Sequence, residues 1–277
     1  MTQSLDVLAI AAHRDDVEQT CGGTLLAHAA RGLRCGILDL SRGELGTRGT
    51  AADRARESGA AARILQVAWR AALDIPDGRV ENTFDNRLKI ARVLRATRPR
   101  VVILPYWQGR HPDHYTSSQL GYEACFAAGL KKLAIGAAAA SELEITVNEL
   151  SEVGPRPPSA GPRRNAADDD RRPATDDPHR PYKILYASLY ADVRPTFVID
   201  ITSHFEARTQ ALFAYKSQYR DQSEGAGLFP AHAEIRTRLE AMAGFYGLLA
   251  GVRYAEPFVQ KEVGLVDDVM AIPVASI

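Results

Sequence analysis

Residues of the types that bind metal ions follow directly after a short apolar run near the start of the chain. Residues 5–12 (LDVLAIAA) lead into His13, Asp15 and Asp16. Zinc takes imidazole nitrogens and carboxylate oxygens as ligands, and a catalytic zinc site needs about three protein ligands and an open position for water. His13 and Asp16 can face one point in a turn, and Asp15 would lie close enough to that water to take its proton. Alternatively, the two acids only cap the helix that follows.

A second cluster of the same residue types follows a later apolar run. Residues 100–105 (RVVILP) are followed, after a short loop, by His111, Asp113 and His114. His114 would complete a set of two histidines and one aspartate with the first cluster, and His111 would remain for acid or oxyanion chemistry. Asp113 could hold an imidazole in one tautomer. The alternative is that both histidines are exposed loop residues and that Asp113 is a helix N-cap.

Apolar runs of strand length alternate with helical patterns through the first half of the chain. This alternation predicts an α/β fold, a Rossmann-like and mostly parallel sheet with helices on both faces. Ligands of such sheets bind at the carboxyl ends of the strands, near the point where the strand order reverses, so both clusters are expected at one edge. The expected strands are residues 5–12, 34–40, 67–73 and 100–105, and the expected helices are residues 22–31, 51–65, 83–97 and 114–130.

The pattern divides the chain into three parts. Residues 1–135 are predicted to form a Rossmann-like catalytic core that carries both clusters. Residues 136–181 contain a proline-rich run and then a charged run, which predicts a mobile or surface excursion. Residues 182–277 are interpreted as the remainder of the same domain, with strands at 182–189 and 196–201 and helices at 202–215 and 231–250.

Composition excludes several classes of function. Lys plus Arg and Asp plus Glu both number 34, so the formal net charge is zero, and the usual electrostatic footprint of a nucleic-acid-binding protein is missing. The three cysteines form no CxxC pair, which favours buried packing residues in a reducing compartment. No apolar stretch predicts a signal peptide or a membrane span. The glycine-rich residues 41–50 lack the phosphate-binding fingerprint. We expect a cytoplasmic protein that binds neither nucleic acid nor membranes.

Both clusters lie in segments that resemble a known family. Residues 11–18 (AAHRDDVE) and 110–114 (RHPDH) resemble the two signatures of the PIG-L/LmbE-like N-acetylglucosamine deacetylases. Further segments resemble the bacterial branch that deacetylates N-acetylglucosaminyl-malate in bacillithiol biosynthesis. They are residues 21–32 (CGGTLLAHAARG), 40–50 (LSRGELGTRGT), 73–83 (LDIPDGRVENT), 213–219 (FAYKSQY) and 254–258 (YAEPF).

The resemblance implies an LmbE-like fold and a role for each residue of the two clusters. Zinc would be held by His13, Asp16 and His114, and Fe²⁺ could replace it in the cell. Asp15 would be the general base. His111, oriented by Asp113, would stabilise the oxyanion or protonate the leaving amine.

The resemblance also implies the substrate and the assembly. Arg54 and Glu57 match positions that line a sugar site, and Glu44 and Arg110 are further candidates for contact with a small sugar conjugate. Members of the branch are often hexameric, so a homo-oligomer is expected. Tyr219, at the end of FAYKSQY, is interpreted as a packing residue rather than a substrate contact.

Arg14 departs from the family pattern, which has proline at this position. Proline fixes φ and rigidifies the turn that aims the ligands, whereas arginine places a cation beside two acids. In one case this cation lowers the basicity of Asp15 or repels the metal. In the other case the side chain points to solvent or contacts an anionic carboxylate of the substrate. Two alternatives to the malate conjugate therefore remain: a deacetylase of another N-acetylglucosamine conjugate, or a metal-loaded sugar-binding protein that Arg14 has made inactive.

Overall fold

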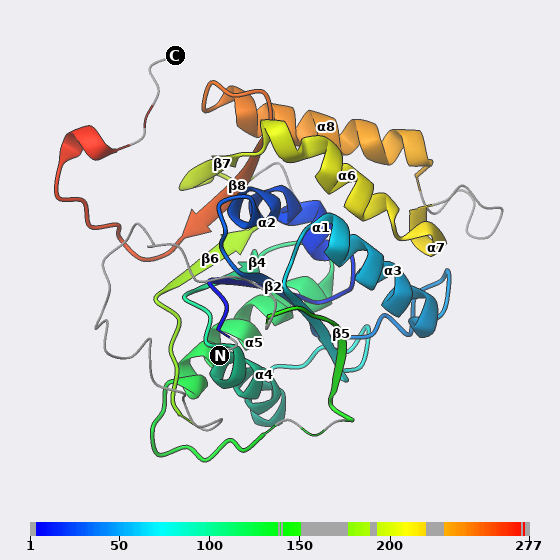
Figure 1. The fold of residues 1–277 in the computed structure, drawn as a ribbon, viewed down its shortest axis with the longest axis vertical. Helices are drawn as coiled ribbons and strands as arrows, with labels where there is room; N and C mark the ends of the chain where they lie inside the picture. Colours follow the sequence, from blue (N-terminus) through cyan, green and yellow to red (C-terminus); the bar gives the residue numbers. More distant parts are fainter. Residues whose placement is uncertain are drawn as a thin grey trace.

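One mostly parallel sheet forms the centre of the protein in this computed structural model (Figure 1). The strand order is β5-β3-β2-β1-β4-β6-β8-β7. The central pairs β3–β2, β2–β1, β1–β4 and β4–β6 are parallel, whereas β5 and β8 run antiparallel to their neighbours. The predicted α/β fold is confirmed. The strands are β1 (Val7–Ala11), β2 (Cys35–Asp39), β3 (Trp69–Leu73), β4 (Val101–Pro105), β5 (Leu143–Asn148), β6 (Lys183–Ala187), β7 (Phe197–Asp200) and β8 (Ala255–Gln260).

Helices cover both faces of the sheet (Figure 1). Helices α4 and α5 pack together on one face, α1, α2, α3 and α6 cover the other, and α8 packs against β8. The helices are α1 (Asp16–Thr20), α2 (Gly22–Ala29), α3 (Ala51–Ile64), α4 (Phe84–Thr97), α5 (Pro112–Ala128), α6 (Phe205–Phe213), α7 (Lys216–Tyr219) and α8 (His232–Leu248), with 3₁₀ turns η2 (Thr202–His204) and η3 (Val269–Ala271). Among the described residues, no helix has the length and apolar character that crossing a membrane would require.

The structure describes residues 4–137, 139, 141–150, 177–188, 193–219, 230–272 and 274. The greater part of the predicted excursion, residues 151–176, lies outside the described residues. The remainder of that segment includes β5, an edge strand that the sequence pattern did not indicate. Only Val147 of this strand is buried, so its apolar signal is weak. Strand β8 was also not predicted.

Strand β1 shows why the central strands read as unbroken apolar runs. All its residues are buried, because helices lie on both faces of the sheet. Successive side chains point to opposite faces. Leu8 and Ile10 belong to the core beneath α4 and α5, and Val7 and Ala9 belong to the core beneath α2, α3 and α6.

The strand order reverses between β1 and β4. From β1 the chain proceeds to β2 and β3 on one side, and then returns to place β4 on the other side of β1. This is the topological switch point at which doubly wound sheets bind ligands. The two clusters of metal-ligating residues follow these two strands, so the fold brings them together.

Candidate active site

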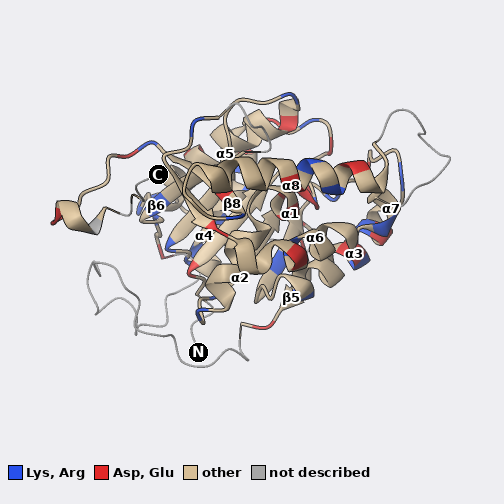
Figure 2. Cartoon of the chain, turned by 90° about the horizontal axis from the view of Figure 1, so that it is seen from above, with Lys and Arg blue, Asp and Glu red and all other residues tan. Residues whose placement is uncertain are grey.

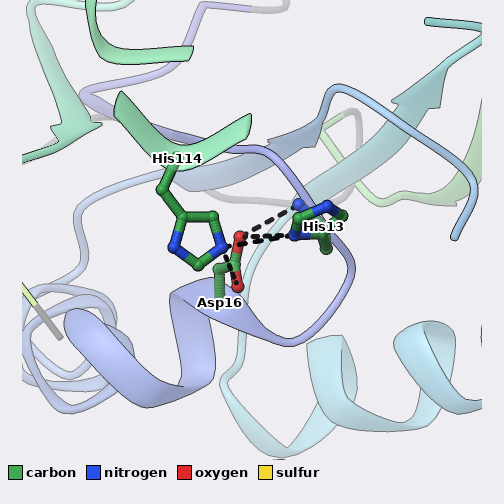
Figure 3. Close-up of side chains that lie close together, drawn as sticks. All are labelled: His13, Asp16 and His114. Atoms are coloured by element: carbon green, nitrogen blue, oxygen red, sulfur yellow. Dashed lines mark hydrogen bonds and ion pairs between the residues drawn. The ribbon is translucent and has the colours of Figure 1, made fainter. Parts of the chain in front are cut away.

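Three side chains converge at the switch point, and one ligand atom of each lies within 4.8 Å of the others (Figure 3). Nδ1 of His13 lies 3.3 Å from Nε2 of His114 and 3.4 Å from Oδ2 of Asp16. Oδ1 of Asp16 lies 3.2 Å from Nε2 of His114. Ligand atoms at the corners of a tetrahedral zinc site with bonds of about 2.0–2.1 Å are separated by about 3.3 Å. The donor types suit a zinc ion, and so do these separations, in which each histidine nitrogen lies next to a different oxygen of Asp16.

Local backbone structure fixes each of these side chains. His13 directly follows the buried strand β1, and its backbone N–H donates to Oδ2 of Asp16 over 3.0 Å, which closes the turn into α1. His111 is the N-cap of α5 and Pro112 occupies its first turn, where proline is preorganised for a helix. His114 consequently lies in the first turn of α5, directed at the end of β1.

The outer nitrogen of His13 is held by two carboxylates. Nε2 of His13 lies 3.2 Å from Oδ2 of Asp113 and 3.2 Å from Oδ1 of Asp77. The Asp113 carboxylate also accepts hydrogen bonds from the backbone N–H groups of Gly78 (2.8 Å) and Val80 (3.2 Å). A proton on Nε2 of His13 leaves the Nδ1 lone pair for a metal, which is the usual arrangement of a histidine ligand and its supporting carboxylate. The carboxylate of Asp113 thus supports His13 rather than His111, the partner that the family resemblance implied.

The acidic surroundings of His13 favour a cation at this point. Burial disfavours its protonated form, but Asp16, Asp113 and Asp77 outweigh burial and raise the pKa of His13 to about 12. The pKa of Asp16 is held well below its usual value, because His114 and His13 outweigh the opposing effect of burial. A divalent cation would find the same favourable potential.

Asp15 lies beside this set but faces different partners. Oδ1 of Asp15 accepts a 2.9 Å hydrogen bond from Nη2 of Arg54, and Oδ2 accepts a 2.5 Å bond from the hydroxyl of Tyr219. Burial raises the pKa of Asp15, while the Arg54 guanidinium opposes that rise. The site therefore contains a carboxylate with raised basicity, held in one orientation.

The surroundings of His111 select one of its tautomers. The backbone N–H of Asp113 donates to Nδ1 of His111 over 3.2 Å, so in the neutral ring the proton lies on Nε2. Burial, together with the positive charge on His13 and His114, lowers the pKa of His111. The ring stacks on that of His114 with centroids 4.8 Å apart. His111 is thus presented beside the ligand set as a neutral hydrogen-bond donor.

The predicted substrate contacts have partners within the protein. Arg54 binds Asp15, and the Glu57 carboxylate accepts hydrogen bonds from the backbone N–H (2.7 Å) and hydroxyl (2.6 Å) of Ser217. Glu44 accepts a 2.8 Å bond from the backbone N–H of Asp77, and Arg110 is exposed in the loop before α5. Contact of these four residues with a substrate stays a prediction.

Two residues of the site were not assigned to it from the sequence. Tyr219 was interpreted as packing, yet its hydroxyl binds Asp15. Asp77 follows the carboxyl end of β3, and its contact with His13 was not foreseen. The signal for Asp77 was available, because an acid just after a third parallel strand lies at the same edge of the sheet as the two clusters.

Arg14 points away from the ligand set. Its side chain is fully buried, with Nη2 2.9 Å from Oε2 of Glu144 in β5 and Nη1 donating to the carbonyl of Ala51 over 3.1 Å. Arg14 therefore does not place its charge against Asp15 and Asp16, and it does not point to solvent or toward a substrate. These expectations were wrong. The guanidinium instead ties the turn after β1 to the edge strand and to the start of α3.

Comparison with known proteins agrees with this fold and site. The family model described as "PIG-L: GlcNAc-PI de-N-acetylase" matches residues 8–125. The chain is 28% identical over 261 residues to a diacetylchitobiose deacetylase of Thermococcus kodakarensis, covering 90% of this chain and 80% of that protein.

Solved structures extend the likeness over nearly the whole chain. The conserved protein TT1542 of Thermus thermophilus is 33% identical, with a TM-score of 0.72 and coverage of 95% of this chain and 98% of that one. An N,N'-diacetylchitobiose deacetylase of Pyrococcus horikoshii, 23% identical, has the same fold, with a TM-score of 0.65 and coverage of 91% and 82%.

Fold and site together define a Rossmann-like α/β protein with a candidate metal-binding set of two histidines and one aspartate at its switch point. Over residues 8–125, which carry both clusters of the site, the chain matches the PIG-L family model, and it is similar to a diacetylchitobiose deacetylase over most of its length.

Proposed function

We propose that this protein is a metal-dependent N-deacetylase that hydrolyses the acetamide of an N-acetylglucosamine conjugate. The spacing of 3.2–3.4 Å among the ligand atoms of His13, Asp16 and His114, with Asp15 beside them, is the observation that carries the proposal. The match of residues 8–125 to the PIG-L family model and the likeness to a diacetylchitobiose deacetylase support the same reaction. We further propose that the protein works in the cytoplasm as a homo-oligomer.

The metal proposed for His13, Asp16 and His114 is zinc, and Fe²⁺ would suit the same nitrogen and oxygen donors. When bound there, such an ion lowers the pKa of a water molecule to about 7 and polarises a carbonyl oxygen.

Asp15 is proposed to move the proton in both halves of the reaction. Its carboxylate accepts a proton from the attacking water as the water oxygen bonds to the acetamide carbon. The same proton then passes to the nitrogen as the C–N bond breaks, which releases acetate and a free amine. Burial suits this role, because a carboxylate of raised pKa is a stronger base near neutral pH.

His111 is proposed to stabilise the negative charge that develops on the carbonyl oxygen. Its Nε2 proton, fixed by the hydrogen bond from the Asp113 N–H to Nδ1, is available for donation without any change of tautomer. The lowered pKa favours this neutral donor form. Asp113 and Asp77 serve as positioning residues for His13.

The substrate that we propose is N-acetylglucosaminyl-malate, as in bacillithiol biosynthesis, because five further segments resemble that branch. A second candidate is diacetylchitobiose, which is favoured by the relative from Thermococcus kodakarensis.

Comparison of kcat/KM for acetate release from both compounds by the zinc-loaded protein separates the two substrates. A higher kcat/KM with the malate conjugate supports the first, and the reverse order supports the second. Failure to release acetate from either compound or from other N-acetylglucosamine conjugates would contradict the deacetylase proposal and favour a sugar-binding protein.

A further inference from the structure

Helix α5 exposes an apolar face. Its exposed positions after the first turn are Tyr115, Gln119, Tyr122 and Phe126, followed by Leu130 just beyond the helix, at spacings that keep them on one side. The outward face of a surface helix is ordinarily polar. Here three aromatic rings and a leucine lie along it. This face, called the α5 stripe below, resembles one side of a helix-packing interface.

A second exposed apolar segment follows β8. Residues 262–272, called the arm below, project away from the body of the domain in both views (Figures 1 and 2). The exposed fractions reach 97% for Val263, 92% for Leu265 and 85% for Met270. The other strongly exposed apolar side chains of the arm are Val266, Val269 and Ile272. Side chains of this kind gain free energy when another surface removes them from water.

The arm begins beside the α5 stripe. Nζ of Lys261, the residue before the arm, lies 4.4 Å from the ring centroid of Trp107, 4.6 Å from that of Tyr186 and 5.4 Å from that of Tyr122. Contacts of an ammonium group with several aromatic faces are favourable. They hold the root of the arm next to the middle of the stripe, while the arm itself leads outward.

The charges of the two surfaces are complementary. Asp267 and Asp268 of the arm are exposed. Around the C-terminal end of the stripe lie the exposed cations Lys131, Lys132 and Arg180, and the guanidinium of Arg180 lies 4.7 Å from the ring centroid of Phe126. Opposite charges flanking two apolar surfaces favour their association and fix its direction.

We propose that the arm of one copy of this chain docks on the α5 stripe of a second copy, and that the second copy reciprocates. A two-fold contact beside the roots of the arms lets each arm reach the stripe of the other copy, because each root lies next to its own stripe. Such an isologous contact covers both apolar surfaces at once. This contact rests on the proposed homo-oligomer and is independent of the proposed deacetylase reaction.

Sedimentation of the full-length protein tests the interface. Phe126→Glu in the stripe and Leu265→Asp in the arm should each weaken association on the order of tenfold or more, because each places a charge in the apolar contact. Leu248→Asp in α8 is the matched control, since Leu248 is 71% exposed but belongs to neither surface. All three variants should keep the circular dichroism spectrum of the wild type. A wild type that is monomeric at every concentration, or association that neither interface variant weakens, would overturn the proposal.

Crosslinking distinguishes exchange between copies from docking within one chain. Gly264→Cys in the arm is sterically free, because nothing lies within 4 Å of a Cβ added there, and Gln119→Cys keeps the apolar residues of the stripe. The native cysteines are buried and do not compete. A mixture of the two single variants, treated with a bismaleimide, should yield crosslinked dimers containing one chain of each. Crosslinks that form only within single chains of the double variant would show that the arm folds onto its own α5, and the proposal would be wrong.

Discussion

The hydroxyl of Tyr219 donates a 2.5 Å hydrogen bond to Oδ2 of Asp15, joining the last residue of α7 to the turn that follows β1. Arg54 holds the other oxygen of the same carboxylate. Tyr219 is itself held in place, because the Glu57 carboxylate binds the backbone and hydroxyl of Ser217 in the same short helix. The proposed general base is thus oriented from two elements remote in sequence.

Tyr219→Phe removes the hydroxyl and keeps the ring. We expect kcat/KM for acetate release to fall about tenfold to a hundredfold, the usual worth of a hydrogen bond to a charged group. The Tyr219 hydroxyl lowers the pKa of Asp15, so the acidic limb of the pH profile should also move to higher pH. Tyr182→Phe, at an exposed tyrosine away from the site, is the control. An unchanged pH profile would remove Tyr219 from the site.

Asp15→Asn removes the proposed base without removing a metal ligand. We expect kcat to fall about a hundredfold to ten-thousandfold, the range usual for loss of a general base. Zinc content should stay stoichiometric, because Asp15 is directed at Arg54 and Tyr219 rather than at His13 and His114. Turnover and metal analysis of the same preparation check both statements, and retained turnover would contradict the role of Asp15.

His114→Ala removes one of three proposed ligands. We expect the purified variant to lose stoichiometric zinc, because too few protein donors remain for a stable site. His28→Ala is a matched control, since His28 binds the carbonyl of Thr24 in α2. Atomic absorption measures the zinc content of both variants. A His114→Ala variant that holds as much zinc as the His28→Ala control would contradict the proposed ligand set.

Arg14→Met keeps an unbranched side chain and removes the buried guanidinium. Loss of the bonds to Glu144 and Ala51 should lower the free energy of unfolding by about 1–2 kcal/mol, a modest loss because Glu144 is partly exposed. We expect kcat/KM to stay within a few-fold of wild type, because Arg14 faces away from the ligand set. A large gain in activity in Arg14→Pro would instead favour the alternative in which Arg14 inactivates the protein.

Stability should depend on His179 below neutral pH. Burial is the main cause that lowers its pKa to about 4, and its Nε2 donates to the carbonyl of Pro99 over 2.7 Å. In the unfolded chain the His179 imidazole takes up a proton near pH 6.5, whereas in the folded chain it does so only near pH 4. The free energy of unfolding that the neutral His179 contributes is therefore lost as the pH falls from 6.5 towards 4. The loss at pH 5 relative to pH 7 should be about 2 kcal/mol. Urea unfolding of the wild type and of His179→Gln at pH 5 and pH 7 measures this loss of stability. An equal pH dependence of the free energy of unfolding in the two proteins would contradict the role of His179.

The sequence patterns predicted the part of the fold that produces strong periodicity. Buried parallel strands such as β1 and β4 read as continuous apolar runs, and the residues that follow them were placed correctly at one edge of the sheet. Strands β5 and β8 were missed because antiparallel strands near a sheet edge carry short and mixed patterns.

The site was foreseeable only where neighbours in sequence are neighbours in space. His13 and Asp16 share one turn, and His111 and His114 share another, so their grouping could be predicted. Contacts between distant segments could not, because no local pattern encodes them. The bond of Tyr219 to Asp15 spans 204 positions, and the bond of Arg14 to Glu144 spans 130. The support of His13 by Asp113 depends equally on how two strand ends meet.

The most direct test of the account is acetate release from N-acetylglucosaminyl-malate and diacetylchitobiose before chelation, after chelation and after zinc is returned, with metal content measured on each sample. We predict that turnover disappears with the metal and returns with about one zinc ion per chain, the number that a single His₂Asp set holds. Turnover that survives complete removal of the metal would contradict the central claim, as would a protein that binds no zinc at His13, Asp16 and His114.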